Sequence, residues 1–420
     1  MINLNCNVVK EIYIYVSTKN IEKKLAQMKI NIFILLIFFG LTNCQSQTKT
    51  ESERRKTEQA ATLFENPKIQ VEFHSRVDTT KIEIKEIASL WTNYLNSEPD
   101  KISDNPYWNE EEKLKYKDFD FSRSLLYQFP SNQLLRNFKP KILSIEKEGD
   151  HYGIRTMYSA DRLEGEYRKS NPWAIQKIYA VRENNQWRLK NSLPIITNNW
   201  NRKTIGKITF IYSPYHKFNE ELAAKANEFC NQVKVEFNFP DWEPFDYYIT
   251  QSGDELGRLL NFDFFAAGYT TGIGLNEKRI LLSGFGSEYY PHEFIHLIVP
   301  KYERHGIIEE GFATWKGGQG GKSFEESASR FAKELSKNDT VTFLDILNKK
   351  WGWQYDAFYT TGAIFCNSAY KKGGVNLVNE LLKIPNDSEK LVENLCLIFD
   401  IEKKDFNDFW RNETLKFIGN

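Results

Sequence analysis

The residues with the clearest chemical potential lie in the segment Pro291–Pro300, which contains the pattern His-Glu-x-x-His. His292 and His296 are four positions apart, and on a helix this spacing places two side chains on one face. Two imidazoles placed in this way can bind one tetrahedral metal ion, with zinc as the usual occupant. Glu293 lies next to the first histidine, where its carboxylate can reach a metal-activated water and act as a general base.

The flanking residues predict that this segment is a helix. Pro291 suits the first turn, Pro300 ends the run, and apolar side chains between them provide a face to bury. A core helix whose histidines only hydrogen-bond to their neighbours would show the same pattern. A third ligand is therefore needed to distinguish a metal site from a packed helix.

Two adjacent carboxylates follow, Glu309 and Glu310, and the second begins the sequence Glu-Gly-Phe-Ala with 13 residues separating it from His296. HExxH followed by EGFA resembles the gluzincin zinc metallopeptidases (peptidase MA-like, thermolysin-type), particularly their aminopeptidase N-like branch. The resemblance implies that Glu310 is the third ligand of one zinc ion per chain, with a fourth position left for water. The spacing is shorter than in aminopeptidases, and Glu309 stands where that family has Asn, so Glu309 is the alternative ligand.

The segment Phe358–Ala363 resembles the Tyr-x-x-Gly-Ala sequence of the same aminopeptidases. In that family the tyrosine hydroxyl stabilises the tetrahedral intermediate, and the resemblance implies this role for Tyr359. Tyr355 is the competing candidate.

One part of the aminopeptidase pattern is missing. The Gly-x-Met-Glu-Asn segment that anchors a free substrate N-terminus has no match, although Gly272–Glu277 occupies a similar place. Exopeptidase specificity is therefore not supported. Ile280–Ser283 is a predicted strand ahead of the metal-binding helix and the candidate edge strand for pairing with an extended peptide.

Other readings of this region are excluded by spacing. Tyr302 stands where metzincins have a third histidine, and no methionine follows for a Met-turn. His305 is off that spacing and is expected in solvent or beside the metal ligands. Gly317–Gly321 lacks the Lys-Ser/Thr ending of a phosphate-binding loop and is predicted to be a flexible loop near the cleft.

The N-terminal region reads as a targeting segment. The apolar run Ile32–Leu41 is far shorter than the roughly 20 residues that span a bilayer, and lysines precede it, as in a secretory signal peptide. Leu41–Cys44 resembles a bacterial lipoprotein signal, apart from Asn43. The resemblance implies a signal region over residues 1–43, with Met28 as the alternative start. It also implies lipidation at Cys44 and a location in the bacterial cell envelope, either on the outer membrane facing the periplasm or on the cell surface.

The rest of the chain is predicted to be α+β. Residues 44–65 are polar and charged and form a tether, and residues 66–202 resemble an NTF2-like or cystatin-like domain, with a helix followed by an antiparallel meander. Residues 203–420 are expected to form a thermolysin-like zincin domain, with a small mixed sheet and a mainly helical C-terminal part. The remaining cysteines of the mature chain, at positions 230, 366 and 396, are expected to be buried free thiols.

The function expected is a zinc-dependent metallopeptidase that hydrolyses peptides or exposed protein segments in the cell envelope, held at the membrane by its lipid. The chain has 56 basic and 56 acidic residues, and this balance argues against nucleic-acid binding. The alternative is a catalytically inactive peptidase-fold lipoprotein that acts as a binding or scaffold module. The presence of Glu293 favours the enzyme, because a degenerate site usually loses its base. A zinc hydrolase for a non-peptide bond is a third option.

Overall fold

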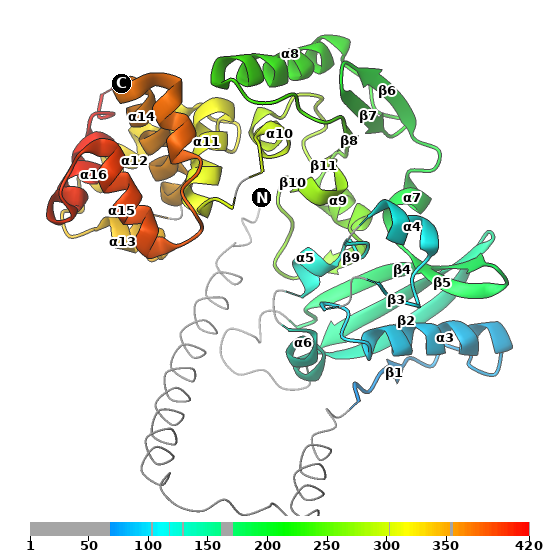
Figure 1. The fold of residues 1–420 in the computed structure, drawn as a ribbon. Helices are drawn as coiled ribbons and strands as arrows, with labels where there is room; N and C mark the ends of the chain where they lie inside the picture. Colours follow the sequence, from blue (N-terminus) through cyan, green and yellow to red (C-terminus); the bar gives the residue numbers. More distant parts are fainter. Residues whose placement is uncertain are drawn as a thin grey trace, which may run out of the picture. The chain divides into compact units, whose positions relative to one another are not determined.

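The computed structural model describes residues 68–419 except for 102–103, 117, 128–129, 161–170, 302 and 353–355. The predicted signal region, tether and Cys44 lie outside these residues. The described part is α+β, as predicted, with two mixed sheets in two units (Figure 1). One unit contains the described residues up to Leu193 together with Gly257–Tyr269, and the other contains Pro194–Leu256 and the chain from Thr270 onward. Within the described residues, no helix combines the length and apolarity that crossing a membrane would require.

The first unit consists of a long helix packed on a largely antiparallel sheet. Helix α3 (Ile82–Leu95) forms where apolar residues recur at helical spacing, and its buried face includes Trp91 and Tyr94. The sheet follows the order β1-β2-β3-β4-β5, and β9 also pairs with β4. Its strands are β1 (Glu72–Phe73), β2 (Lys139–Glu148), β3 (His151–Ser159), β4 (Ala174–Glu183), β5 (Gln186–Lys190) and β9 (Phe262–Phe265). The short helices are α4 (Glu110–Lys115), α5 (Arg123–Leu126) and α6 (Ser131–Asn137).

The boundary between the units differs from the predicted division at residues 202 and 203. Strand β9 pairs with β4, so the segment Gly257–Tyr269 belongs to the first unit although the sequence assigned it to the second. The first unit also ends earlier, at Leu193, because Asn201–Ile205 pairs in the second sheet. No strand was predicted at Phe262–Phe265, and the local sequence of a four-residue strand does not specify its partner, so the segment was assigned to the wrong unit.

The second unit begins with a five-stranded sheet in the order β10-β11-β8-β7-β6. Its strands are β6 (Asn201–Ile205), β7 (Ile208–Tyr212), β8 (Phe245–Ile249), β10 (Gly272–Leu275) and β11 (Ile280–Ser283). Strands β7, β8 and β11 are parallel, while β6 and β10 run antiparallel to their neighbours. The prediction that Ile280–Ser283 is the edge strand is therefore wrong, since β11 lies between β8 and β10. Strand β10 is at the edge.

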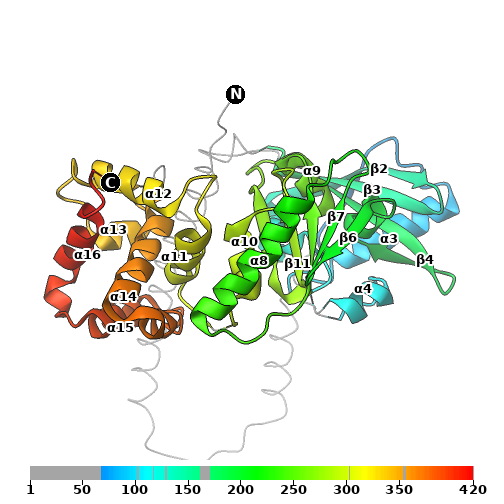
Figure 2. The same cartoon turned by 90° about the horizontal axis from the view of Figure 1, so that it is seen from above.

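Helices cover this sheet and continue to the C-terminus. Helix α8 (Glu220–Phe237) begins at Asn219, whose side chain accepts a hydrogen bond from the backbone of Leu222, as its sequence indicates. It packs against α10 (Figure 2). The other elements are α7 (Ser192–Ile196), α9 (Gly253–Leu259), η2 (Asn276–Lys278), α10 (Pro291–Ile298), α11 (Gly306–Gly317), α12 (Phe324–Leu335), α13 (Phe343–Leu347), α14 (Ala357–Leu381), α15 (Ser388–Phe399), η4 (Lys403–Asp405) and α16 (Phe406–Leu415).

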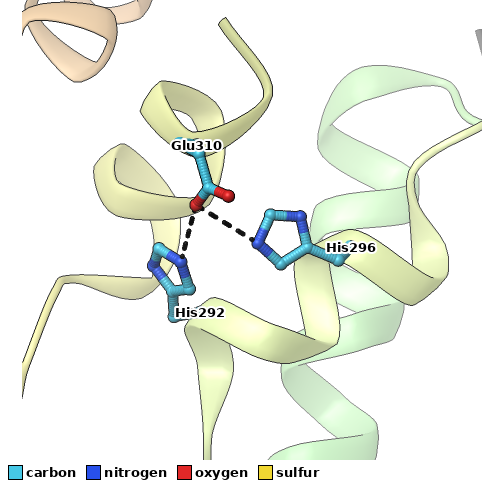
Figure 3. A group of neighbouring side chains, drawn as sticks. All are labelled: His292, His296 and Glu310. Carbon is cyan, nitrogen blue, oxygen red and sulfur yellow. Dashed lines mark hydrogen bonds and ion pairs between the residues drawn. The ribbon is translucent and has the colours of Figure 1, made fainter. Parts of the chain in front are cut away.

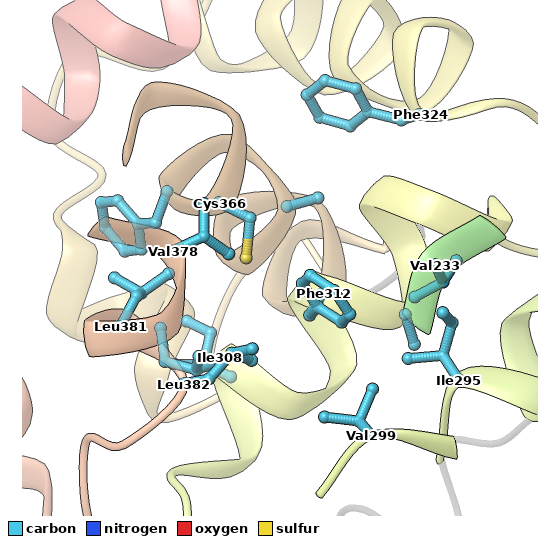
Figure 4. Packing of buried hydrophobic residues seen from close by; sticks show 14 of the residues in the cluster. Val233, Ile295, Val299, Ile308, Phe312, Phe324, Cys366, Val378, Leu381 and Leu382 are labelled. Carbon is cyan, nitrogen blue, oxygen red and sulfur yellow. The ribbon is translucent and has the colours of Figure 1, made fainter. Parts of the chain in front are cut away.

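A single apolar core joins α8, α10, α11 and α14 (Figure 4). Val233, Ile295, Phe312 and Val378 come from these four helices in turn, and all are buried. Cys230 and Cys366 are buried free thiols, as predicted, whereas Cys396 is only half-buried. This core fixes the helix that carries HExxH against the helix that carries Glu310.

Candidate metal centre

Helix α10 presents both histidines on one side and its apolar residues on the other. Pro291 occupies its first turn, and Phe294 packs edge-on against Tyr247 of β8, with ring centroids 5.4 Å apart. The imidazole centroids of His292 and His296 are 5.2 Å apart. The helix predicted from the sequence is thus confirmed, and burial of its apolar side points the histidines toward α11.

Glu310 of α11 meets both histidines (Figure 3). Its Oε2 atom is 3.3 Å from Nε2 of His292 and 3.6 Å from Nε2 of His296. In a tetrahedral site with metal–ligand distances of about 2.0–2.1 Å, two ligand atoms are about 3.3–3.4 Å apart. The three side chains therefore have the donor set and spacing to hold a metal ion, and no other group of this kind occurs among the described residues.

The two neighbouring carboxylates of α11 take different positions. Glu309 lies 3.7 Å from Nδ1 of His296, the ring nitrogen that faces away from Glu310. Nδ1 of His292 is 2.7 Å from the carbonyl oxygen of Gly318 and donates to it, leaving Nε2 free for a metal. The structure therefore favours Glu310 as the metal ligand. Glu309 lies where its carboxylate can orient the ring of His296.

Strong charge interactions accompany this arrangement. Burial alone would raise the pKa of Glu310, but hydrogen bonds with His292 and His296 hold it at about 2. Burial alone would lower the pKa of His296, but Glu309 and Glu310 raise it to about 10. A cation placed among these groups would replace the proton on His296.

The five predicted catalytic and metal-binding residues line one cavity of about 380 Å³: His292, Glu293, His296, Glu310 and Tyr359. Burial is the main cause that raises the pKa of Glu293, and the two histidines partly oppose it. The Tyr359 ring centroid is 6.2 Å from that of His292. The alternative tyrosine, Tyr355, lies outside the described residues.

A close contact between two glycines explains how Tyr359 reaches this cavity. Gly311 of α11 and Gly362 of α14 face each other, and a Cβ atom on either would overlap the backbone of the opposite helix. These are the glycines of the two motifs, EGFA and Tyr-x-x-Gly-Ala. Because neither glycine has a side chain, α11 and α14 approach each other closely at this point. Glu310, one residue before Gly311, and Tyr359, three residues before Gly362, therefore line the same cavity.

Strand β10 forms the opposite wall, which the sequence did not predict as a strand. Gly272 packs against the ring of Tyr290 and the side chain of Glu293. The Tyr290 hydroxyl oxygen is 3.2 Å from that of Thr271, and burial together with the Glu293 carboxylate raises its pKa to about 12. Sequence reasoning missed Tyr290 and Thr271, because neither has a spacing relation to the metal motif.

His305 has a structural role that the sequence did not indicate. It is buried, and its Nδ1 accepts a hydrogen bond from the backbone nitrogen of Ile307 at 3.2 Å, so it caps α11. The expectation of a solvent position is therefore wrong. Tyr302, the residue that excluded a metzincin, lies outside the described residues.

Comparison with models of known protein families gives no match for this chain, and comparison with curated proteins gives none either. The site must therefore be interpreted from its own geometry. That geometry combines three convergent ligand atoms, a half-buried carboxylate and a phenol around one cavity.

Proposed function

We propose that this protein is a zinc-dependent metallopeptidase of the gluzincin type. The observation that carries the proposal is the spacing of the His292, His296 and Glu310 ligand atoms, with Glu293 and Tyr359 on the same cavity. Two imidazoles and a carboxylate suit zinc, and three protein ligands leave a position for water, as in catalytic zinc sites. One zinc ion per chain is expected.

When bound, zinc supplies Lewis acidity and lowers the pKa of a water molecule in the site. Glu293 accepts a proton from the attacking water and later delivers it to the departing amine. Its raised pKa suits both steps. The carboxylate is a stronger base toward the water, and the carboxylic acid keeps its proton until the amine departs. The Tyr359 hydroxyl donates a hydrogen bond to the oxyanion that develops on the scissile carbonyl.

The position of β10 supports a peptide substrate over a non-peptide one. This strand is the edge of its sheet and also borders the cavity, so one row of its backbone groups is available to an extended chain. Gly272 and Gly274 face Glu293 and put no side chain between the strand and the base. A peptide can therefore lie along β10 as an added strand, with its carbonyl near the metal ligands.

Two finer fold assignments accompany this proposal. In the second unit, a small mixed sheet precedes the helix pair α10 and α11, an arrangement that resembles the thermolysin-like zincin domain. In the first unit, α3 packs on an antiparallel meander, as in NTF2-like or cystatin-like domains. We propose these assignments together with the function.

The N-terminal sequence supports a lipid-anchored location in the bacterial cell envelope. Leu41–Cys44 follows a short apolar run, and a charged segment leads from it to the first described residue. Replacement of Cys44 by Ala should move the protein from the membrane fraction to the soluble fraction. Unchanged membrane retention would contradict the lipid anchor.

The test of activity compares the wild type with Glu293→Gln. The mature protein should contain about one zinc per chain by elemental analysis and cleave peptides in a mixed-sequence library, read by mass spectrometry. Glu293→Gln should retain the zinc and lose cleavage, because the amide cannot accept the proton. Glu221→Gln, on the exposed side of α8, is the matched control and should behave as the wild type.

Two results would contradict the proposal in different ways. Stoichiometric zinc with no difference between the wild type and Glu293→Gln would favour the inactive binding or scaffold lipoprotein. Absence of zinc would overturn the metal site itself.

A further inference from the structure

The glycine-rich loop after α11 contains a tight turn, residues 319–322, which we call the glycine turn. The backbone nitrogen of Gln319 donates to the carbonyl of Lys322 at 2.9 Å, and the nitrogen of Lys322 donates to the carbonyl of Gln319 at 3.0 Å. Between them, Gly320 and Gly321 have φ values of +58° and +79°. Positive φ at both central residues is typical of a type I′ turn, where glycine is favoured.

The glycine turn is fixed at both ends. Before it, the Gly318 carbonyl accepts the hydrogen bond from Nδ1 of His292. A Cβ atom on Gly317 would lie 2.4 Å from the backbone nitrogen of the same histidine, so the chain runs directly against α10. After the turn, Ser323 and Glu326 form a capping box that begins α12. The turn therefore has a defined position relative to the metal-binding helix.

The side chain of Gln319 lines the metal cavity together with the first residues of β10. Within the part of the chain that the structure describes, its carboxamide has no hydrogen-bond partner. The threonine hydroxyls of the cavity differ in this respect. Thr270 donates to the carbonyl of Gly272 at 2.5 Å, and the Thr271 hydroxyl oxygen is 3.2 Å from that of Tyr290. Gln319 thus brings a free donor and a free acceptor into the cavity.

We propose that the Gln319 carboxamide binds the backbone N–H and C=O of one substrate residue, on the edge of the peptide that β10 leaves free. This inference rests on the proposed peptidase function and adds a substrate-binding residue to it. A peptide that lies along β10 as an added strand pairs through only one of its two edges. The N–H and C=O groups of the other edge lose water in the cavity, so they need partners there. A carboxamide matches one such residue, because it both donates and accepts.

The composition of the cavity favours a neutral group in this role. Glu293, Glu309 and Glu310 also line it, but an ionised carboxylate only accepts hydrogen bonds and would repel a peptide carbonyl. The glycines of the turn add no competing side chains. Cβ atoms on Gly320 and Gly321 would have no atom within 4 Å, so the turn leaves room for a bound chain.

The first test uses the zinc-loaded mature protein and one peptide whose cleaved bond is located by mass spectrometry. Gln319→Ala should raise KM and lower kcat/KM roughly 3- to 10-fold, as expected for one lost hydrogen bond, while kcat and zinc content change little. Gln232→Ala is the matched control, because this glutamine is exposed on α8, and it should behave as the wild type.

Ester analogues of the same peptide show whether Gln319 contacts the substrate. Each analogue replaces one backbone N–H, away from the cleaved bond, by an ester oxygen. One of these esters should lower kcat/KM of the wild type by a factor similar to that of Gln319→Ala. The same ester should have no further effect on Gln319→Ala, because its partner is already absent.

The glycine turn offers a second pair of variants. Gly320→Asn creates the sequence Asn-Gly, which is strongly preferred in type I′ turns, and should keep wild-type kinetics. Gly320→Val places a β-branched residue at positive φ and should reproduce the loss seen in Gln319→Ala. Wild-type kinetics in Gly320→Val would contradict the role of the turn in positioning Gln319.

The outcomes separate this inference from the function on which it rests. Wild-type kcat/KM in Gln319→Ala would overturn the role of Gln319 and keep the peptidase. A loss in Gln319→Ala with the full effect of every ester retained would show that Gln319 only supports the loop, and would also overturn its role. Failure of the wild type to cleave every peptide, with zinc bound, would overturn the peptidase and this inference together.

Discussion

Both units of this protein hold carboxylates that are at least half-buried, but the surroundings of these carboxylates differ. In the second unit, Glu293 and Glu310 face two histidines across an open cavity. In the first unit, Asp120 is enclosed, and its oxygens accept hydrogen bonds from the hydroxyls of Tyr94 and Ser122, each at 2.5 Å. Burial alone therefore does not mark a reactive site. A buried carboxylate becomes chemically useful when its partners can exchange protons or bind a metal and when a substrate can enter beside it.

The largest effect expected in this comparison is that of Glu310→Ala. Removal of a ligand should reduce bound zinc far below one per chain and lower cleavage on the order of 10³-fold or more. Elemental analysis and peptide cleavage measure both. Glu309→Ala is the informative control, because a carboxylate that only orients His296 should weaken zinc affinity by roughly 10- to 100-fold. If Glu309→Ala loses more zinc than Glu310→Ala, the assignment of the ligand is reversed.

Tyr359→Phe should have the next largest effect. Loss of one donor to the oxyanion costs about 10²- to 10³-fold in kcat, while zinc content and KM should change little. Steady-state kinetics on one cleaved peptide separates the two parameters. An unchanged kcat would show that Tyr359 only packs in the site and would favour Tyr355 as the donor to the oxyanion.

In the first unit, Asp120→Asn should affect stability and leave the chemistry intact. An amide nitrogen cannot accept the hydrogen bonds that one of the Asp120 oxygens now receives, and a buried unsatisfied group costs about 1–3 kcal/mol in the free energy of unfolding. Denaturant unfolding should show the loss, with zinc content unchanged. Asp104→Asn is the control, since that side chain is exposed. Loss of cleavage by a fully folded Asp120→Asn protein would contradict the view that Asp120 contributes to stability alone.

The smallest effect is expected for Glu112→Gln, and it depends on pH. Burial raises the pKa of Glu112, although Asn191, Asn109 and Trp108 donate hydrogen bonds that oppose this. A carboxyl group with a raised pKa in the folded state stabilises the fold below its unfolded pKa, and this contribution is lost as pH rises through the folded value. Relative to the wild type, Glu112→Gln should therefore gain about 2–4 °C in thermal midpoint between pH 4 and pH 7. If the thermal midpoints of the wild type and Glu112→Gln change in parallel with pH, Glu112 does not ionise as a buried group, and the prediction is wrong.

Local patterns predicted helix α10 of the site and the main elements of the first unit. Apolar residues at helical spacing predicted α3, and alternation with intervening turns predicted β2 to β5. Strand β10 was missed because Gly272 and Gly274 give a four-residue strand little intrinsic preference. Its conformation comes from pairing with β11, which is a contact that local sequence does not specify.

The site was predictable where one helix determines it and not where several elements meet. His292 and His296 are related by a helical repeat, so spacing alone places them together. The choice between Glu309 and Glu310 depends on how α11 is rotated against α10, and adjacent positions on a helix give no indication of this. Tyr290 enters the cavity because β10 lies beside it, and only the sheet order shows that neighbour.

The contact between Gly311 and Gly362 has a consequence for recognising related proteins. Besides its metal motif, the chain has a second recognisable pattern, which is a pair of glycines 51 positions apart (362 − 311). A larger residue at either position would displace a helix. Insertions between them would change the interval but not the need for both. We expect a relative that keeps HExxH but replaces either glycine to be one in which selection on the active site has ceased.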